Sequence, residues 1–151
     1  MTKVYLDVCC LNRPFDDQSQ GRVKLETTAV KAIIERIRAG LYAGIGSEAV
    51  RLETNRISDP ERKTYVQAQE RLFTQIIVIR PELTQRGVLL QAMGFGTLDA
   101  LHIACAESAE ADVLLTTDDR MLRLAARVSQ KLFVKVANPA VWLMEIENHE
   151  T

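Results

Sequence analysis

The segment Val113-Leu114-Leu115-Thr116-Thr117-Asp118 decides the fold class, because an apolar run ends there in a polar turn that carries an acid. Consecutive aliphatic residues are typical of a strand that is buried on both faces, as in the interior of a parallel sheet. We expect a strand over residues 113–116 and a helix over about 120–128. Asp118 is therefore predicted to lie at the carboxyl end of a central strand.

Similar short apolar runs elsewhere predict four more strands, over residues 4–6, 42–45, 76–79 and 133–136. Apolar spacing and capping signals predict helices between them, over 23–39, 48–57, 60–73, 82–93 and 98–109, with a last helix opening at Asn138-Pro139. Residues 11–21 are expected to form a loop. This alternation indicates an α/β protein of three α/β/α layers around a central, mostly parallel sheet of about five strands.

The composition is that of an ordinary globular protein, with 151 residues, 47% hydrophobic and 26% charged residues. We expect one domain over residues 1–147 and a short tail over 148–151. A net charge of −1 excludes nucleic-acid binding by bulk positive charge. We find no apolar run long enough for a membrane span and no signal peptide, so we expect a cytoplasmic protein without a membrane partner. The cysteines, Cys9, Cys10 and Cys105, read as reduced, buried residues.

Acidic residues occur where this architecture places its ligand site, beyond the carboxyl ends of the strands. Asp7 and Asp118 each follow a strand, Glu53 lies on the helix after the second strand, and Asp99 lies in the first turn of a helix capped by Thr97. Each acid alone is as easily a helix cap or a solvated side chain. Together they predict a site for a hard cation, Mg²⁺ or Mn²⁺, because these ions prefer oxygen ligands. One or two such ions can activate a water for phosphodiester cleavage.

Four segments resemble the PIN-domain family, which includes the VapC toxins of toxin–antitoxin pairs. They are Val4-Tyr5-Leu6-Asp7, the stretch from Ser47 to Glu53, Leu98-Asp99-Ala100-Leu101-His102-Ile103-Ala104, and the stretch from Leu114 to Met121. The resemblance covers nearly the whole chain in the right order, and the last two segments are the more specific.

The resemblance implies a metal-dependent endoribonuclease. Asp7, Asp99 and Asp118 would bind Mg²⁺ or Mn²⁺, and Glu53 would be a further ligand or a base that orients the water. Thr116 would be a near-site hydroxyl. The family also implies an RNA substrate, a homodimer and, for a toxin, a cognate antitoxin protein that blocks the acidic cleft.

The chain departs from the family pattern directly after its first acid. Family members often carry Ser, Thr or Asn two residues after that acid, where this chain has Cys9. We expect the departure to remove a polar neighbour, with Asn12, Asp16 or Asp17 as candidate substitutes. The stretches 9–17 and 138–143 are not general VapC features, and they indicate a subgroup whose role differs from that of a toxin.

Further residues near the predicted site have two readings each. Asp119 is either a fifth ligand or a helix cap, and His102 is either a partner or base near Asp99 or a buried structural histidine. Glu48 competes with Glu53, but the spacing from Ser47 favours Glu53. Phe95 either stacks on a base or packs on its own domain. Arginines near these segments are candidate RNA-phosphate contacts, and Arg13, Arg51 and Arg120 are the ones we select.

Two other functions remain open from the sequence. The first is a PIN-like module that binds RNA or a partner protein without cutting, which the Cys9 departure motivates. The second is a receiver-like domain phosphorylated on an aspartate, since such domains also carry acids at the ends of parallel strands. The receiver-like function lacks support because it calls for a lysine directly after a late strand, at the same edge as the acids. Lys135 lies within the last predicted strand and not after it.

Overall fold

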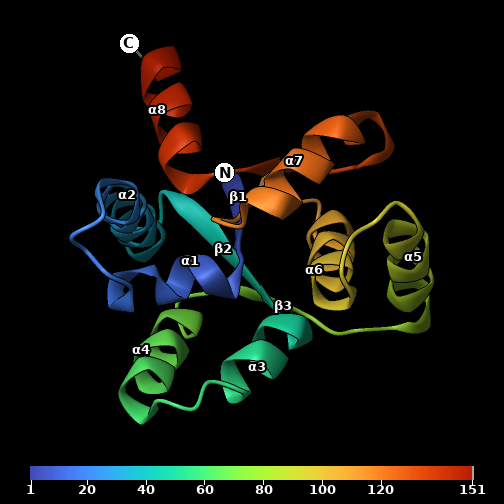
Figure 1. The fold of residues 1–151 in the computed structure, drawn as a ribbon, viewed down its shortest axis with the longest axis horizontal. Helices are drawn as coiled ribbons and strands as arrows, with labels where there is room; N and C mark the ends of the chain where they lie inside the picture. The colour runs from blue at the N-terminus through green and yellow to red at the C-terminus, as the bar shows by residue number, and fades with distance from the viewer. Residues whose placement is uncertain (151) are drawn as a thin grey trace.

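A five-stranded parallel sheet forms the centre of the protein (Figure 1). The computed structural model describes the backbone of residues 1–150 and the side-chain environments through Asn148. The strand order is β3-β2-β1-β4-β5, and every neighbouring pair is parallel. The strands are β1 (Thr2–Leu6), β2 (Tyr42–Ser47), β3 (Gln75–Ile77), β4 (Val113–Leu115) and β5 (Lys135–Ala137). This confirms the α/β class and the predicted number of strands.

Helices cover the sheet on both sides. They are α1 (Val8–Asn12), α2 (Gly21–Arg38), α3 (Glu48–Asn55), α4 (Pro60–Glu70), α5 (Pro81–Ala92), α6 (Thr97–Ser108), α7 (Asp119–Arg127) and α8 (Pro139–Glu150), with 3-10 turns at Arg13–Phe15 and Ser129–Lys131. Figure 1 shows α2 next to α8 on one side of the strands and the α5–α6 hairpin on the other. Among the described residues, no helix has the length and apolar character that a membrane crossing requires.

The two central strands, β1 and β4, are the most deeply buried part of the sheet. Val4, Tyr5 and Leu6 have no solvent exposure, and neither has any residue of β4. Burial on both faces is what their apolar sequences predict. The central pair therefore provides a rigid base for the residues that follow each strand.

Side-chain caps fix the starts of the helices near the carboxyl edge of the sheet. The hydroxyl of Ser47 accepts a hydrogen bond from the amide of Val50, and the carboxylate of Asp59 accepts one from the amide of Glu61. Each cap satisfies an amide that has no partner within its helix. Thr97 was expected to cap α6, but Gly96 occupies the cap position and Thr97 is the first helical residue.

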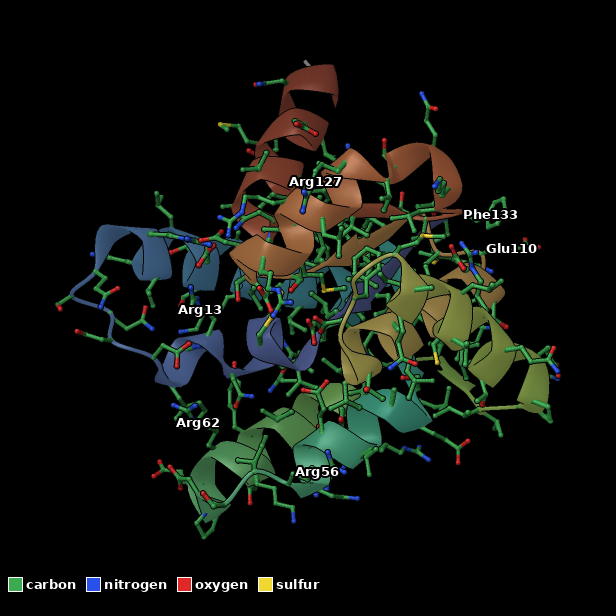
Figure 2. The ribbon with its side chains drawn as sticks, turned by 45° about the vertical axis from the view of Figure 1, so that its right-hand side comes forward. Arg13, Arg56, Arg62, Glu110, Arg127 and Phe133 are labelled. Atoms are coloured by element: carbon green, nitrogen blue, oxygen red, sulfur yellow. The ribbon has the colours of Figure 1, made fainter. Side chains whose placement is uncertain are left out.

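The predictions were wrong mainly at the edges of the sheet. β3 ends at Ile77 and β5 begins only at Lys135, while Val78 is 56% and Phe133 is 79% exposed. Phe133 lies at the molecular surface (Figure 2), with the guanidinium of Arg86 over its ring. Both residues lie outside the paired part of an edge strand, and an edge strand has a neighbouring strand on one side only.

Two other segments are more helical than predicted. The expected loop over residues 11–21 contains the end of α1 and a 3-10 turn. Residues 148–150 of the expected tail continue α8, and Thr151 lies outside the described residues.

Candidate metal centre

Two of the predicted acids meet where the central strands end. Asp7 follows β1 and Asp118 follows β4, and the register pairs Leu6 with Leu115. The hydroxyl of Thr116 donates a 3.0 Å hydrogen bond to Oδ2 of Asp7 and accepts a 3.2 Å hydrogen bond from the amide of Asp118. One buried hydroxyl therefore connects the first and last acids of the set.

Glu53 is brought to Asp7 by a buried histidine. His102 has no solvent exposure, and its Nε2 is hydrogen bonded to Oε1 of Glu53 and lies 3.6 Å from Oδ1 of Asp7. One potential ligand atom from each of these three residues lies within 4.8 Å of the others. The printed contacts of His102 are thus with Glu53 and Asp7 rather than with Asp99, and its full burial also fits a structural histidine.

The other nitrogen of His102 joins a buried hydrogen-bonded chain. Nδ1 of His102 lies 2.7 Å from the hydroxyl of Tyr5, which lies 2.7 Å from Oγ of Ser47. Burial disfavours the charged imidazole, but the hydrogen bond to Glu53 and the nearby carboxylates outweigh it and raise the pKa of His102. The chain fixes the orientation of the ring that holds Glu53.

Asp99 shows that the carboxylates share one electrostatic environment. Burial, followed by the negative charges of Asp7 and Asp118, raises the pKa of Asp99 from 3.8 to about 6. Glu53 acts in the same direction, and His102 opposes it. Asp99 and Asp118 also line a small hollow of about 90 Å³ with the Gly94–Gly96 turn and Arg120.

The donor set fits a hard divalent cation. Asp7 is buried. Oδ1 of Asp118 accepts hydrogen bonds from the amides of Arg120 and Met121, which leaves Oδ2 of Asp118 for a ligand. All acids of the set offer carboxylate oxygens, which suit Mg²⁺ and Mn²⁺. A cation held among them would also relieve the repulsion that raises the pKa of Asp99.

Cys9 keeps a polar contact at the position where the sequence departs from the family. Its Sγ lies 3.3 Å from Oγ1 of Thr116 and accepts a 3.3 Å hydrogen bond from the amide of Thr117. The expectation of a lost polar neighbour is therefore wrong. The candidate substitutes point elsewhere, because Asp16 pairs with Arg13 and Asp17 bonds to Ser19.

Asn12 is the third of those candidate substitutes. It is the last residue of α1, and its Oδ1 is buried without a hydrogen-bond partner among the described residues. It therefore makes no hydrogen bond to the acids through this oxygen within the described part of the chain.

Two of the other candidates are engaged in ion pairs. Asp119 forms an ion pair with Arg22, and Arg13 is held by Glu26. Neither the ligand role of Asp119 nor the RNA contact of Arg13 is supported by this geometry. Arg51 is exposed on α3. Of the other readings, Glu48 accepts a hydrogen bond from the amide of Ile79, and Phe95 is buried in its own domain.

Sequence reasoning missed one residue near the acids. Tyr5 lies two residues before Asp7, so strand alternation places both side chains on the same face, and this signal was available. Arg22 is one of the arginines considered as phosphate contacts, but its pairing with Asp119 could not be predicted, because that contact spans 97 residues of the chain.

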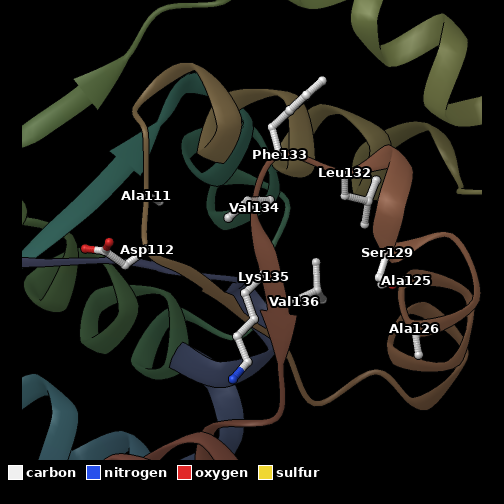
Figure 3. Close-up of a pocket in the computed structure, with 10 residues that line it drawn as sticks. All are labelled: Ala111, Asp112, Ala125, Ala126, Ser129, Leu132, Phe133, Val134, Lys135 and Val136. Carbon is white, nitrogen blue, oxygen red and sulfur yellow. The ribbon is translucent and has the colours of Figure 1, made fainter.

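A cavity larger than the hollow beside Asp99 lies at the opposite end of the sheet from the acids. It measures about 590 Å³ and is lined by β5, the end of α7 and the turn after it (Figure 3). The cavity lies at the amino end of the strands, because its lining includes Asp112, just before β4, and Lys135, the first residue of β5. It contains none of the predicted site residues, so size alone does not locate the site.

The fold and the acids define a class: an α/β protein with a parallel sheet and a carboxylate cluster at its carboxyl edge. The family model described as "PIN domain" matches residues 4–127, and the chain therefore belongs to the PIN-domain family. PIN domains are in general metal-dependent nucleases. This assignment removes the receiver-like alternative.

Comparison with solved structures agrees with the fold. The crystal structure of FitAcB from Neisseria gonorrhoeae superposes with a TM-score of 0.57 at 17% identity, over 90% of this chain and 97% of that chain. At this identity the likeness concerns the fold alone. No curated protein matches the chain by sequence.

Proposed function

We propose that the protein is a metal-dependent endoribonuclease that hydrolyses phosphodiester bonds of single-stranded RNA. The observation that supports the proposal is the grouping of Asp7 and Glu53 around His102, with Asp118 linked to Asp7 through Thr116 and Asp99 close enough for their charges to raise its pKa. The four residues come from four separate segments, and family membership supplies the reaction class. The polar contacts of Cys9 remove the lost polar neighbour that motivated the alternative of a module that binds without cutting.

Asp7, Asp99 and Asp118 would hold Mg²⁺ or Mn²⁺, and Glu53 would be either a further ligand or the base that orients the water. The cation would supply Lewis acidity toward the phosphate and lower the pKa of the attacking water. Thr116 keeps Oδ2 of Asp7 oriented, and the first amides of α7 keep Oδ1 of Asp118 oriented. Both carboxylates are therefore preorganised, which reduces the cost of assembling the site.

Glu53 is suited to orient the water and accept its proton. Its Oε1 is hydrogen bonded to His102, which leaves Oε2 for the water. The side chain of Glu53 is 26% exposed, compared with 7% for Asp7, so it lies on the open side of the cluster. His102 acts on Glu53 by fixing its position and needs no proton-transfer step of its own.

The substrate would approach over the hollow between the Gly94–Gly96 turn and α7. Arg120 lines this hollow together with Asp99 and Asp118 and is a cation suited to an RNA phosphate. Arg51 on the exposed face of α3 is a second candidate for a backbone contact. Such local cations replace the bulk positive charge that the chain lacks.

The direct test is cleavage of end-labelled single-stranded RNA with Mn²⁺ or Mg²⁺. Wild type should cut in the presence of the metal and stop when a chelator is added, while Asp7→Asn should be inactive under both conditions. The matched control is Asp17→Asn, since Asp17 is exposed and bonded locally to Ser19. Equal cleavage by wild type and Asp7→Asn would remove the metal-site proposal.

We extend the proposal to partners and location. The protein would act in the cytoplasm as a homodimer, and if it is a toxin, a cognate antitoxin would cover the acidic edge. Light scattering tests the dimer, and co-purification with the product of a neighbouring small gene tests the antitoxin. A strictly monomeric protein that co-purifies alone would remove both expectations.

A further inference from the structure

A buried carboxylate outside the acid cluster connects distant parts of the chain. Glu26 on α2 is 1% exposed, and its two oxygens are shared among Arg13, Arg22 and Asn138. Oε1 accepts hydrogen bonds of 2.9 and 2.6 Å from Arg13. Oε2 accepts a 3.1 Å bond from Arg22 and a bond from the amide group of Asn138. A buried charge with this many donors is fully compensated and holds its partners in a defined geometry.

These contacts join the two stretches that set this chain apart from general VapC sequences. Arg13 belongs to the stretch 9–17 and Asn138 to the stretch 138–143, and both donate hydrogen bonds to the side chain of Glu26. Asn138 also caps α8 through its Oδ1, which accepts from the amide of Ala140. The two sequence features are therefore parts of one structural unit, and that unit extends toward the acids through Arg22.

Arg22 reaches the turn that carries Asp118. Its guanidinium donates hydrogen bonds of 2.6 and 2.7 Å to the two carboxylate oxygens of Asp119 and one of 3.1 Å to the carbonyl of Thr117. Arg22 thus binds the residues on both sides of Asp118. A planar guanidinium with a bidentate carboxylate contact restrains orientation as well as distance.

We propose that Arg22, anchored by Glu26, is a positioning residue for Asp118. The proposal rests on the metal-dependent function proposed above, because Asp118 needs a fixed position only if it holds a ligand. Arg22 holds the backbone of the turn at Thr117 and the side chain at Asp119. Asp118 is thereby presented to the cluster with its free oxygen in place.

Loss of the guanidinium would free this turn. Thr117 and Asp119 would lose their contacts with α2, and the charge of Asp119 would be uncompensated one residue from the metal ligand. Removing a residue that is hydrogen bonded to a metal ligand typically weakens metal binding by about 10- to 100-fold. Because Arg22 acts through the neighbours of Asp118, we expect the lower end, about tenfold weaker Mn²⁺ binding.

The experiment compares Arg22→Ala, Arg22→Lys and Arg38→Ala by calorimetric titration with Mn²⁺ alone. Arg38 is the matched control, because it lies on the same helix, is equally exposed at 49%, and pairs locally with Glu35. Thermal unfolding of each metal-free variant is measured alongside. Asp119→Asn is a milder second variant that leaves the Glu26 contacts intact and keeps the test open if Arg22→Ala does not fold.

The proposal predicts about tenfold weaker Mn²⁺ binding for Arg22→Ala, partial recovery in Arg22→Lys, and wild-type binding for Arg38→Ala. It also predicts that the losses in Arg22→Ala and Asp119→Asn are not additive in the double variant. Wild-type affinity in Arg22→Ala, or an equal loss in Arg38→Ala, would overturn it while leaving the metal site standing. Failure of wild type to bind Mn²⁺ would instead overturn the metal site and this proposal together.

Discussion

Oγ1 of Thr116 donates a 3.0 Å hydrogen bond to Oδ2 of Asp7, although 109 residues separate them in the chain. The contact exists because β1 and β4 are neighbours in the sheet and end at the same level. The same oxygen accepts the amide of Asp118 and contacts Cys9. The buried hydroxyl of Thr116 therefore links the ends of β1 and β4 to the two acids that follow them.

Thr116→Val should weaken Mn²⁺ binding about tenfold, because a hydrogen bond to a charged group contributes about 1.5 kcal/mol and 1.4 kcal/mol equals a factor of ten. The change keeps the shape of the side chain and removes only the hydroxyl. Calorimetry with Mn²⁺ measures the effect. Thr116→Ser should restore binding, and Thr28→Val, on the exposed side of α2, should leave it unchanged. Full affinity in Thr116→Val would show that the hydroxyl does not orient Asp7.

The raised pKa of Asp99, about 6 against an ordinary 3.8, predicts how the metal-free protein responds to pH. Between these values the folded protein holds a proton that the unfolded chain has lost, so stability falls as the pH rises through this window. Asp99→Asn should therefore be more stable than wild type at pH 7 in a chelator and similar to it near pH 4.

Thermal unfolding at the two pH values measures this difference. Asp17→Asn serves as the comparison, since hydrogen bonds from Ser19 lower the pKa of Asp17 and its loss should give no gain at pH 7. Added Mn²⁺ should stabilise wild type at pH 7 and have little effect on Asp99→Asn. An identical pH response in wild type and Asp99→Asn would contradict the mutual repulsion of the acids.

Tyr5→Phe should destabilise the protein by about 1–3 kcal/mol, because it leaves buried polar atoms of Ser47 and His102 without their partner. Urea unfolding measures the loss. Tyr42→Phe is the control, since its hydroxyl forms only a longer 3.3 Å contact with Arg36 near the surface. A loss no larger than that of the control would mean that the buried chain is not needed to hold His102.

Gly96→Ala tests the hollow beside the acids. An added Cβ would meet only Oδ2 of Asp99, at 3.9 Å, and the backbone at φ −66° accepts any residue. The methyl group should raise KM for RNA several-fold and leave kcat and Mn²⁺ affinity close to wild type. Gly21→Ala, which meets nothing within 4 Å at the start of α2, is the control. Unchanged KM would place the substrate elsewhere.

The central part of the fold could be predicted because its signals are local. Continuous apolar runs mark β1 and β4, and the caps at Ser47, Asp59 and Asp118 stand directly before their helices. The edge strands could not be delimited in this way. Val78 and Phe133 are as apolar as core residues, but they lie beyond the ends of the edge strands and are exposed there.

The acids could be predicted as a set, but their supporting contacts could not. Strand ends and the family pattern pointed to Asp7, Glu53, Asp99 and Asp118. Whether an arginine is free to bind RNA depends on contacts between distant parts of the chain. Arg13, a candidate RNA contact, instead forms an internal ion pair with Glu26. A sequence pattern records residue types, whereas these pairings arise only when α2 packs beside the turn after β4.

The position of β4 between β1 and β5 also determines when the acids can work together. During translation Asp7 leaves the ribosome early, but Thr116 and Asp118 are added only after three quarters of the chain, and β4 must then insert beside β1. With this strand order, the carboxylate cluster cannot be complete until β4 has been synthesised and paired with β1.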